Sequence, residues 1–232
     1  MARRLRTVAP GVPLHVVQRG NNRTTCFFGD EDFDRYLRFL RRAADEERCR
    51  IHAYCLMSNH VHLLVTPEDN WACARFMKVV NQRYAQHLNR VHERTGTPWE
   101  GRYRSNVVFS MRYVLACYRY IELNPVRANM VRHPREYKWS SYRVNAEGKE
   151  DSLLTPHDQY RRLGSTWASR RENYRALFKA HIDEEELDQI RQATNGNYAL
   201  GNDRFREEIE SALGRRATPG KSGRPPKKKR SR

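Results

Sequence analysis

The chain has 232 residues, which suits one moderate domain with an appendage or two small domains. Hydrophobic residues make up 38% and aromatic residues 10%, which excludes a wholly disordered chain. Lys and Arg number 44 against 27 Asp and Glu, and the resulting net charge of +17 favours an anionic partner, nucleic acid first and an anionic membrane surface second.

Three further classes are disfavoured. No apolar run reaches the roughly 18 residues of a membrane-spanning helix, and no apolar signal core follows the basic N-terminus. The five cysteines are scattered and form no Cys-x-x-Cys pair, which argues against a disulfide framework or a cysteine-based zinc site. We therefore expect a cytoplasmic, nucleoid-associated protein.

Strand and helix patterns alternate through the first part of the chain. In chain order the predicted elements are a strand at 14–19, a helix at 30–47 with Asp30 as its cap, strands at 50–56 and 60–65, a helix at 71–93, a strand at 102–109 and a helix at 111–123. This β-α-β-β-α-β order with a following helix predicts a ferredoxin-like, split-βαβ fold of the α+β class, an antiparallel sheet with helices on one face.

The chain after this pattern changes in composition. Residues 146–152 are polar and lack periodicity, so they predict a linker, and helical spacing returns at about 155–163, 169–181, 183–194 and 202–213. We predict a catalytic domain at 1–147, a small helical C-terminal domain at 148–213 and a disordered basic tail at 214–232. No DNA-recognition helix stands out in the helical part.

The tail carries nine of the basic residues and no acidic residue, which leaves +8 of the net charge of +17 to the residues before it. Gly223-Arg224-Pro225 followed by Lys227, Lys228 and Lys229 resembles an AT-hook, an extended basic strand that lies in the DNA minor groove. A generic basic arm with purely electrostatic affinity for DNA is the alternative interpretation.

His60 and His62 are the first candidate for chemistry. Residues two apart on a strand point to the same face, so both imidazoles share one side of the predicted strand while Val61 points into the core. Two neighbouring imidazoles can bind one divalent cation. The alternative is a pair of hydrogen-bonded histidines without a ligand.

The predicted helix at 111–123 and the residue after it offer a candidate third ligand and a candidate reactive group. The carboxamide of Asn124 is a plausible hard ligand for Mg²⁺ or Mn²⁺, although Pro125 disfavours α geometry there and predicts that Asn124 is the last turn or cap. Tyr120 lies four residues before Asn124 and shares its helix face. Tyr118 and Tyr113 fit this spacing less well, and an ordinary core tyrosine is the alternative for Tyr120.

Several segments in this order resemble a known family. Residues 56–65 read LMSNHVHLLV and resemble the HUH segment of single-tyrosine transposases, and residues 120–128 read YIELNPVRA and look like the tyrosine segment of their IS200-like, REP-associated branch. The segments QRGNNR at 18–23 and WEGRY at 99–103 also resemble segments of this family. The resemblance covers about residues 10–145, and the family fold agrees with the predicted ferredoxin-like order.

The resemblance implies a single-strand DNA endonuclease and strand transferase. His60, His62 and Asn124 would bind Mg²⁺ or Mn²⁺, which polarises the scissile phosphate. Tyr120 would be the nucleophile and form a 5′-phosphotyrosine link, releasing a free 3′-OH. The implied partner is single-stranded hairpin DNA of the REP-like palindromic kind, bound by a monomer or a homodimer.

Basic and aromatic side chains bind single strands by charge and stacking. The candidate DNA contacts outside the tail are Arg19, Arg23, Trp99, Arg102, Tyr103 and Arg104. For each of these, a solvated charge or an ordinary core-edge side chain is the alternative.

Other classes fit less well. A histidine-triad nucleotide hydrolase needs a third histidine where Leu64 stands, and a base deaminase needs His-x-Glu with Pro-Cys-x-x-Cys, which the sequence lacks. A non-catalytic DNA-binding regulator derived from the transposase fold remains the alternative function.

Overall fold

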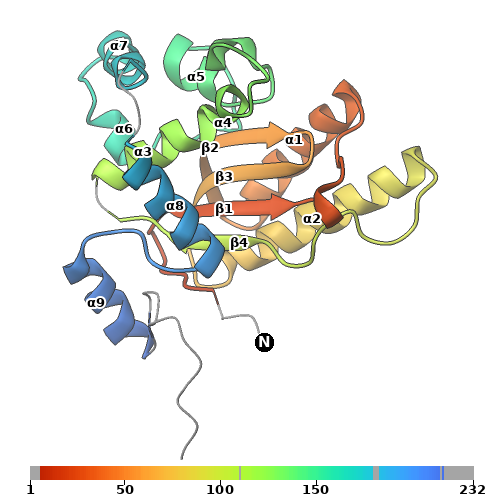
Figure 1. The fold of residues 1–232 in the computed structure, drawn as a ribbon, viewed down its shortest axis with the longest axis horizontal. Helices are drawn as coiled ribbons and strands as arrows, with labels where there is room; N and C mark the ends of the chain where they lie inside the picture. The colour runs from red at the N-terminus through yellow and green to blue at the C-terminus, as the bar shows by residue number, and fades with distance from the viewer. Residues whose placement is uncertain (1–5, 110, 180–182, 215, 217–232) are drawn as a thin grey trace, which may run out of the picture.

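The computed structural model describes residues 6–109, 111–179, 183–214 and 216. Four strands form one antiparallel sheet in the order β2-β3-β1-β4 (Figure 1). The strands are β1 (Leu14–Arg19), β2 (Cys49–Met57), β3 (His60–Pro67) and β4 (Arg104–Val107). The ferredoxin-like α+β fold predicted from the sequence is confirmed, with β4 shorter than expected.

The strand register separates an apolar face of the sheet from a polar one. Leu14 and Val16 of β1 and Val61 of β3 are fully buried on the first face. Because Val17 pairs with His62, Arg19 with His60 and His15 with Asn106, side-chain alternation brings imidazole, guanidinium and amide groups together on the second face. The predicted shared orientation of His60 and His62 is thereby confirmed.

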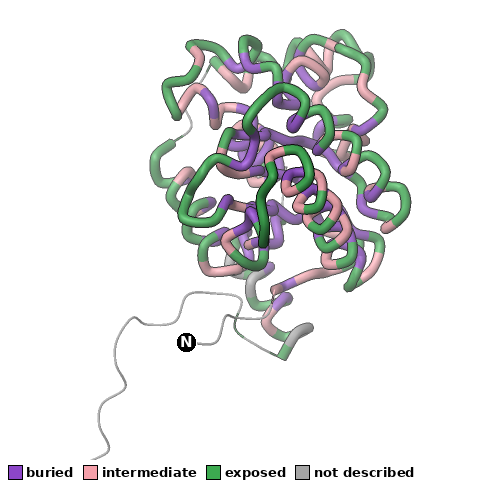
Figure 2. Tube along the Cα trace, turned by 90° about the vertical axis from the view of Figure 1, so that its right-hand side faces the viewer, coloured by how far each residue is buried: buried purple, intermediate pink, exposed green. Residues whose placement is uncertain are grey.

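Two amphipathic helices cover the apolar face, α1 (Asp30–Glu46) and α2 (Ala72–Val91) (Figure 1). Figure 2 shows the buried residues enclosed between the layers. The predicted cap is wrong by one position: Gly29 is the N-cap of α1, and Asp30 lies in the first turn, paired with Lys138 at 2.9 Å. The acidic first turn still suits the positive end of the helix dipole.

The helix that follows β4 is broken at Leu123. Helix α3 (Met111–Glu122) is succeeded at once by α4 (Asn124–Arg127), and Pro125 occupies the first turn of α4, where a missing backbone N–H is tolerated. Asn124 thus begins a short helix, which corrects the prediction that it ends one. The backbone N–H of Ala128 donates to the Asn124 carbonyl at 3.0 Å.

The remaining helices are the short elements η1 (Asn21–Arg23), η2 (Pro134–Glu136), α5 (Tyr142–Glu147) and α6 (Asp158–Arg161), followed by α7 (Trp167–Leu177), α8 (Glu184–Gly196) and α9 (Asp203–Leu213). Helix α8 packs on β4, β1 and α3, over the polar face of the sheet (Figure 1). The predicted boundary between 147 and 148 stays a prediction, but α8, which lies beyond it, contacts the sheet directly.

A buried acidic side chain ties α3 to two of these helices. Glu122 is fully buried and accepts hydrogen bonds from Ser141 at 2.6 Å, Asn145 at 2.8 Å and Tyr174 at 2.8 Å. We call these four residues the carboxyl network. Burial raises the pKa of Glu122 to about 7, and the three hydrogen bonds oppose that rise.

Among the described helices, none combines the length and the hydropathy that crossing a bilayer requires. The cellular location expected from composition stays a prediction.

Candidate functional site

The two predicted metal-binding histidines lie side by side on β3. Their ring centroids are 4.9 Å apart, and the rings are nearly perpendicular. The Nδ1 of His60 lies 2.6 Å from Oδ1 of Asn59, an acceptor, so His60 carries its proton on Nδ1 and leaves Nε2 bare. Burial lowers the pKa of His60 to about 4, helped by the positive charge of Arg19 and opposed by Asn124, so the imidazole is neutral at pH 7.

His62 belongs to a chain of buried polar groups that the sequence did not indicate. Its Nδ1 lies 2.9 Å from Nε2 of His15, whose Nδ1 lies 3.0 Å from the Thr194 hydroxyl. The hydroxyl of Thr194 lies 2.7 Å from Oδ1 of Asn106. We call His15, His62, Asn106 and Thr194 the imidazole network. It joins three strands of the sheet to α8.

Both imidazoles of this network are neutral. Burial lowers the pKa of His15 to about 3 and holds the pKa of His62 well below its usual value. The neutral form is the one that offers a lone pair to a cation.

Tyr120 stands against this network. The centroid of its ring lies 5.7 Å from that of His62 and 5.5 Å from that of His15, and both contacts are edge to face. The guanidinium of Arg127 lies 4.2 Å from the centroid of the tyrosine ring and donates to the Tyr120 carbonyl at 2.7 Å. Arg191 of α8 donates to Asp188 at 2.8 Å, and the proximity of the Tyr120 side chain helps to raise the pKa of Arg191.

The other two tyrosines of α3 are engaged elsewhere. Tyr118 is fully buried beside Tyr160 and Tyr174, with its hydroxyl 3.4 Å from the backbone nitrogen of His157. The hydroxyl of Tyr113 donates to Gln189 at 3.0 Å. Of the three, Tyr120 is the one whose ring contacts His62.

Asn124 lies near enough to His60 for its side chain to raise the pKa of that imidazole. Its amide nitrogen is buried without a hydrogen-bond partner among the described residues. The carboxamide oxygen of Asn124 and two neutral imidazoles together form a donor set that can hold a divalent cation. Within the described ranges no three His, Cys, Asp or Glu side chains gather as a metal cluster, so a cation here depends on the amide oxygen.

A cleft of about 250 Å³ opens beside Tyr120 and His62. Its lining includes the predicted DNA contacts Arg19, Arg102 and Arg104, together with Arg191. Arg104 is held by Asn195 of α8 at 2.6 Å. The cleft therefore presents several guanidinium groups beside the tyrosine, an arrangement suited to a phosphate chain.

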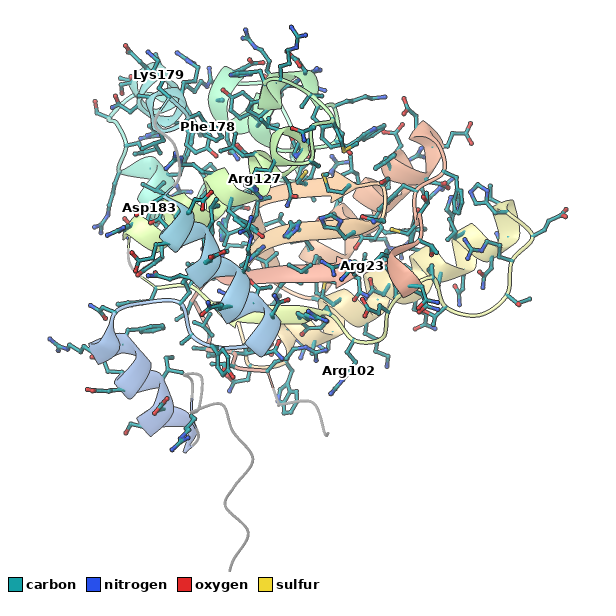
Figure 3. All side chains as sticks on the ribbon, in the orientation of Figure 1. Arg23, Arg102, Arg127, Phe178, Lys179 and Asp183 are labelled. Atoms are coloured by element: carbon teal, nitrogen blue, oxygen red, sulfur yellow. The ribbon has the colours of Figure 1, made fainter. Side chains whose placement is uncertain are left out.

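The remaining predicted contacts lie apart from this cleft. Arg23 is exposed on η1, and in Figure 3 it lies toward the end of the strands away from Arg127. The tail candidates Arg224, Lys227, Lys228 and Lys229 lie outside the described residues.

The two predicted stacking residues have covered rings. Trp99 is 4% exposed and packs against Tyr36 and Tyr84, with its indole N–H directed at the Asn81 carbonyl. Tyr103 is 8% exposed and lies under the guanidinium of Arg6 at 3.6 Å. Both side chains are largely buried and also line a pocket of about 470 Å³, so their role as DNA contacts stays a prediction.

With this geometry in place, the comparisons are informative. The family model "Transposase IS200 like" matches residues 10–124, a range that contains His60, His62, Tyr120 and Asn124. Residues 10–124 belong to the IS200-like transposase family. No curated protein matches the chain in sequence.

The fold is also that of a solved relative. The structure of a REP-associated tyrosine transposase bound to a REP hairpin aligns with a TM-score of 0.57 and 12% identity, over 68% of this chain and 99% of that one. A second structure, from Deinococcus radiodurans R1, aligns over 56% of this chain and 92% of that one at 20% identity. Its TM-score of 0.36 is too low to establish a shared fold. The first likeness establishes the shared fold.

Sequence reasoning missed His15, Arg127, Arg191 and Thr194. Arg127 lies within the matching YIELNPVRA segment, so that motif was the available signal for it. Figure 3 shows Arg127 beside the sheet, toward the side where α8 lies. His15 had no local signal, because its role depends on β1 pairing with β3. Arg191 and Thr194 depend on how α8 docks.

Proposed function

We propose that this transposase nicks and rejoins single-stranded hairpin DNA through a covalent link to Tyr120. The observation that carries the proposal is the position of Tyr120, beside His62 and at the wall of a cleft lined by arginines.

The reaction is a transesterification. The phenol oxygen of Tyr120 attacks a backbone phosphorus and forms a new bond to it. The phosphorus keeps its bond to the 5′ oxygen, and its bond to the 3′ oxygen breaks. The phenol proton is lost and the departing 3′ oxygen gains one, so the products are a 5′-phosphotyrosine and a free 3′-OH. Because one phosphodiester replaces another, a second 3′-OH can reverse the step without ATP.

The chain's own side chains have distinct roles in this scheme. Guanidinium groups in the cleft bind the phosphates and orient the strand. Arg127 and Arg191 contact Tyr120 itself and stabilise negative charge that develops on its oxygen.

A cation would be held by Nε2 of His60, Nε2 of His62 and the amide oxygen of Asn124. When bound, Mg²⁺ or Mn²⁺ would polarise the scissile phosphate and offset charge in the transition state.

A hairpin of the REP type is the proposed substrate. The support is the shared fold with a relative whose structure holds such a hairpin. A single-stranded flank is flexible enough to bring a phosphate to a tyrosine fixed on a helix. The basic tail, including Arg224 and Lys227–Lys229, would add electrostatic affinity for the same DNA.

The test is a covalent adduct. The purified protein is incubated with labelled hairpin DNA from its genomic neighbourhood and Mg²⁺ or Mn²⁺, and the products are separated on a denaturing gel. We expect an adduct with the wild-type protein, none with Tyr120→Phe, and an undiminished adduct with the matched control Tyr113→Phe on the same helix.

An adduct that persists in Tyr120→Phe would contradict the assignment of the nucleophile. Tight hairpin binding without cleavage by the wild-type protein would instead support the non-catalytic regulator.

A further inference from the structure

The imidazole of His62 has two nitrogens, and only one of them can face a cation. Nδ1 is occupied, because it lies 2.9 Å from Nε2 of His15. Whether Nε2 carries a lone pair or a proton depends on which histidine donates in that contact. The following argument rests on the proposed function, in which His62 is a metal ligand.

The direction of the contact is set at the far end of the chain, in α8. The hydroxyl oxygen of Thr194 lies 2.8 Å from the backbone carbonyl of Ile190 and 2.7 Å from Oδ1 of Asn106. A carbonyl oxygen only accepts, so the hydroxyl proton of Thr194 points away from His15. The Thr194 lone pairs then face Nδ1 of His15 at 3.0 Å, and that nitrogen must donate.

A neutral imidazole carries one N–H, so His15 with a proton on Nδ1 has a bare Nε2, which accepts from Nδ1 of His62. His62 in turn has a bare Nε2. His15 is fully buried and His62 is 5% exposed, so both imidazoles depend on protein groups for most of their hydrogen bonds.

We propose that Thr194 and His15 are positioning residues that fix the tautomer of His62, so that its Nε2 lone pair is available to the cation. Thr194 lies beyond residue 124, outside the matched range of the family model, and reaches the sheet because α8 packs over β1 and β4. The metal site is therefore complete only with α8 in place.

His60 provides an internal contrast. Its Nδ1 is held by its sequence neighbour Asn59 at 2.6 Å, so its tautomer does not depend on α8. A change at Thr194 should therefore alter His62 and leave His60 as it was, whereas general loosening of the fold would alter both.

The test reads the tautomer directly. Long-range ¹H–¹⁵N NMR on the metal-free protein should show His60 and His62 protonated on Nδ1. Thr194→Val removes the acceptor at nearly constant volume, and we expect a mixture of tautomers at His62 with His60 unchanged. Mn²⁺ affinity, measured by electron paramagnetic resonance, should fall about 10–100-fold, as is usual when a partner of a metal-binding histidine is lost. Thr194→Ser should restore both readouts.

Three outcomes overturn the proposal: a wild-type His62 protonated on Nε2, a Thr194→Val protein with unchanged His62 tautomer and Mn²⁺ affinity, or Thr194→Ser behaving like Thr194→Val. Tyr120→Phe separates this proposal from the proposed function, because it should abolish the adduct without changing the tautomer. If the wild-type protein forms no adduct but Thr194→Val still shifts the His62 tautomer and weakens Mn²⁺ binding, the nickase assignment fails and the positioning role stands.

Discussion

The protein buries two polar networks of similar size on either side of α3, and they differ in charge. The imidazole network consists of neutral histidines, an amide and a hydroxyl, and it joins the sheet to α8. The carboxyl network surrounds Glu122 with three donors and joins α3 to α7 and the segment 141–145. The first touches the candidate nucleophile, and the second anchors the helix that carries it.

Burial shifts the pKa values of the two networks in opposite directions. It lowers the pKa of His15 to about 3 and raises the pKa of Glu122 to about 7, because in both cases it disfavours the charged form. Low pH therefore lowers the stability contributed by the neutral histidines, and high pH lowers the stability contributed by the neutral carboxyl group. Three variants should separate these effects.

The largest effect is expected from removing the centre of the carboxyl network. Glu122→Ala leaves Ser141, Asn145 and Tyr174 without their shared acceptor and opens a cavity, so the free energy of unfolding should fall by about 3–5 kcal/mol. Urea unfolding measures the change. The exposed Glu172→Ala on α7 serves as the control and should stay within about 0.5 kcal/mol of wild type. A loss as small as the control's would show that the network adds no stability.

The second-largest effect is a loss of folding stability at high pH. Because the folded pKa of Glu122 is raised from 4.5 to about 7, its contribution to stability is full below pH 4.5 and is lost as pH rises through 7. The wild-type protein should lose roughly 2 kcal/mol from this group between pH 5 and pH 8. Glu122→Gln keeps the shape without a titratable group, so its stability should lack this decline. A decline equal to wild type in the variant would place the titrating group elsewhere.

The smallest effect concerns acid, and His52 allows it to be measured away from the site. Its nitrogens contact the Thr155 carbonyl at 2.6 Å and the Thr66 hydroxyl at 2.7 Å, and burial lowers its pKa from 6.5 to about 3. Stability is full above pH 6.5 and is lost as pH falls toward 3, by roughly 1–2 kcal/mol by pH 5. In His52→Gln the slope of unfolding free energy against pH should fall by about one proton between pH 6 and pH 4. An unchanged slope would assign the acid sensitivity to other groups.

The parts of the site that the sequence predicted are those that depend on local geometry. His60 and His62 share a face because strand side chains alternate, and Tyr120 with Asn124 follows helical spacing within one segment. The order of strands and helices was likewise readable from apolar periodicity. The new helix that begins at Asn124 was not predicted, because Pro125 is tolerated in the first turn of a helix.

The burial of the two aromatic DNA-contact candidates could not be predicted from the sequence. Trp99, Tyr103 and Arg102 all lie in the WEGRY segment, and nothing in their spacing distinguishes a ring that stacks on DNA from a ring in the core. The packing of Trp99 against Tyr36 and Tyr84 comes from segments far apart in the chain. Such contacts are long-range, and periodicity carries no information about them.

The secondary elements, the histidine pair, the tyrosine and the excess of basic residues could be predicted from the chain alone, because each depends on composition or on the spacing of a few residues. The position of His15 behind His62, the three donors around Glu122, and the approach of Thr194 and Arg191 to the tyrosine became visible only in the folded protein. These contacts depend on strand pairing and helix docking between segments up to 179 residues apart, which are set by the packing of whole elements and leave no local pattern in the chain.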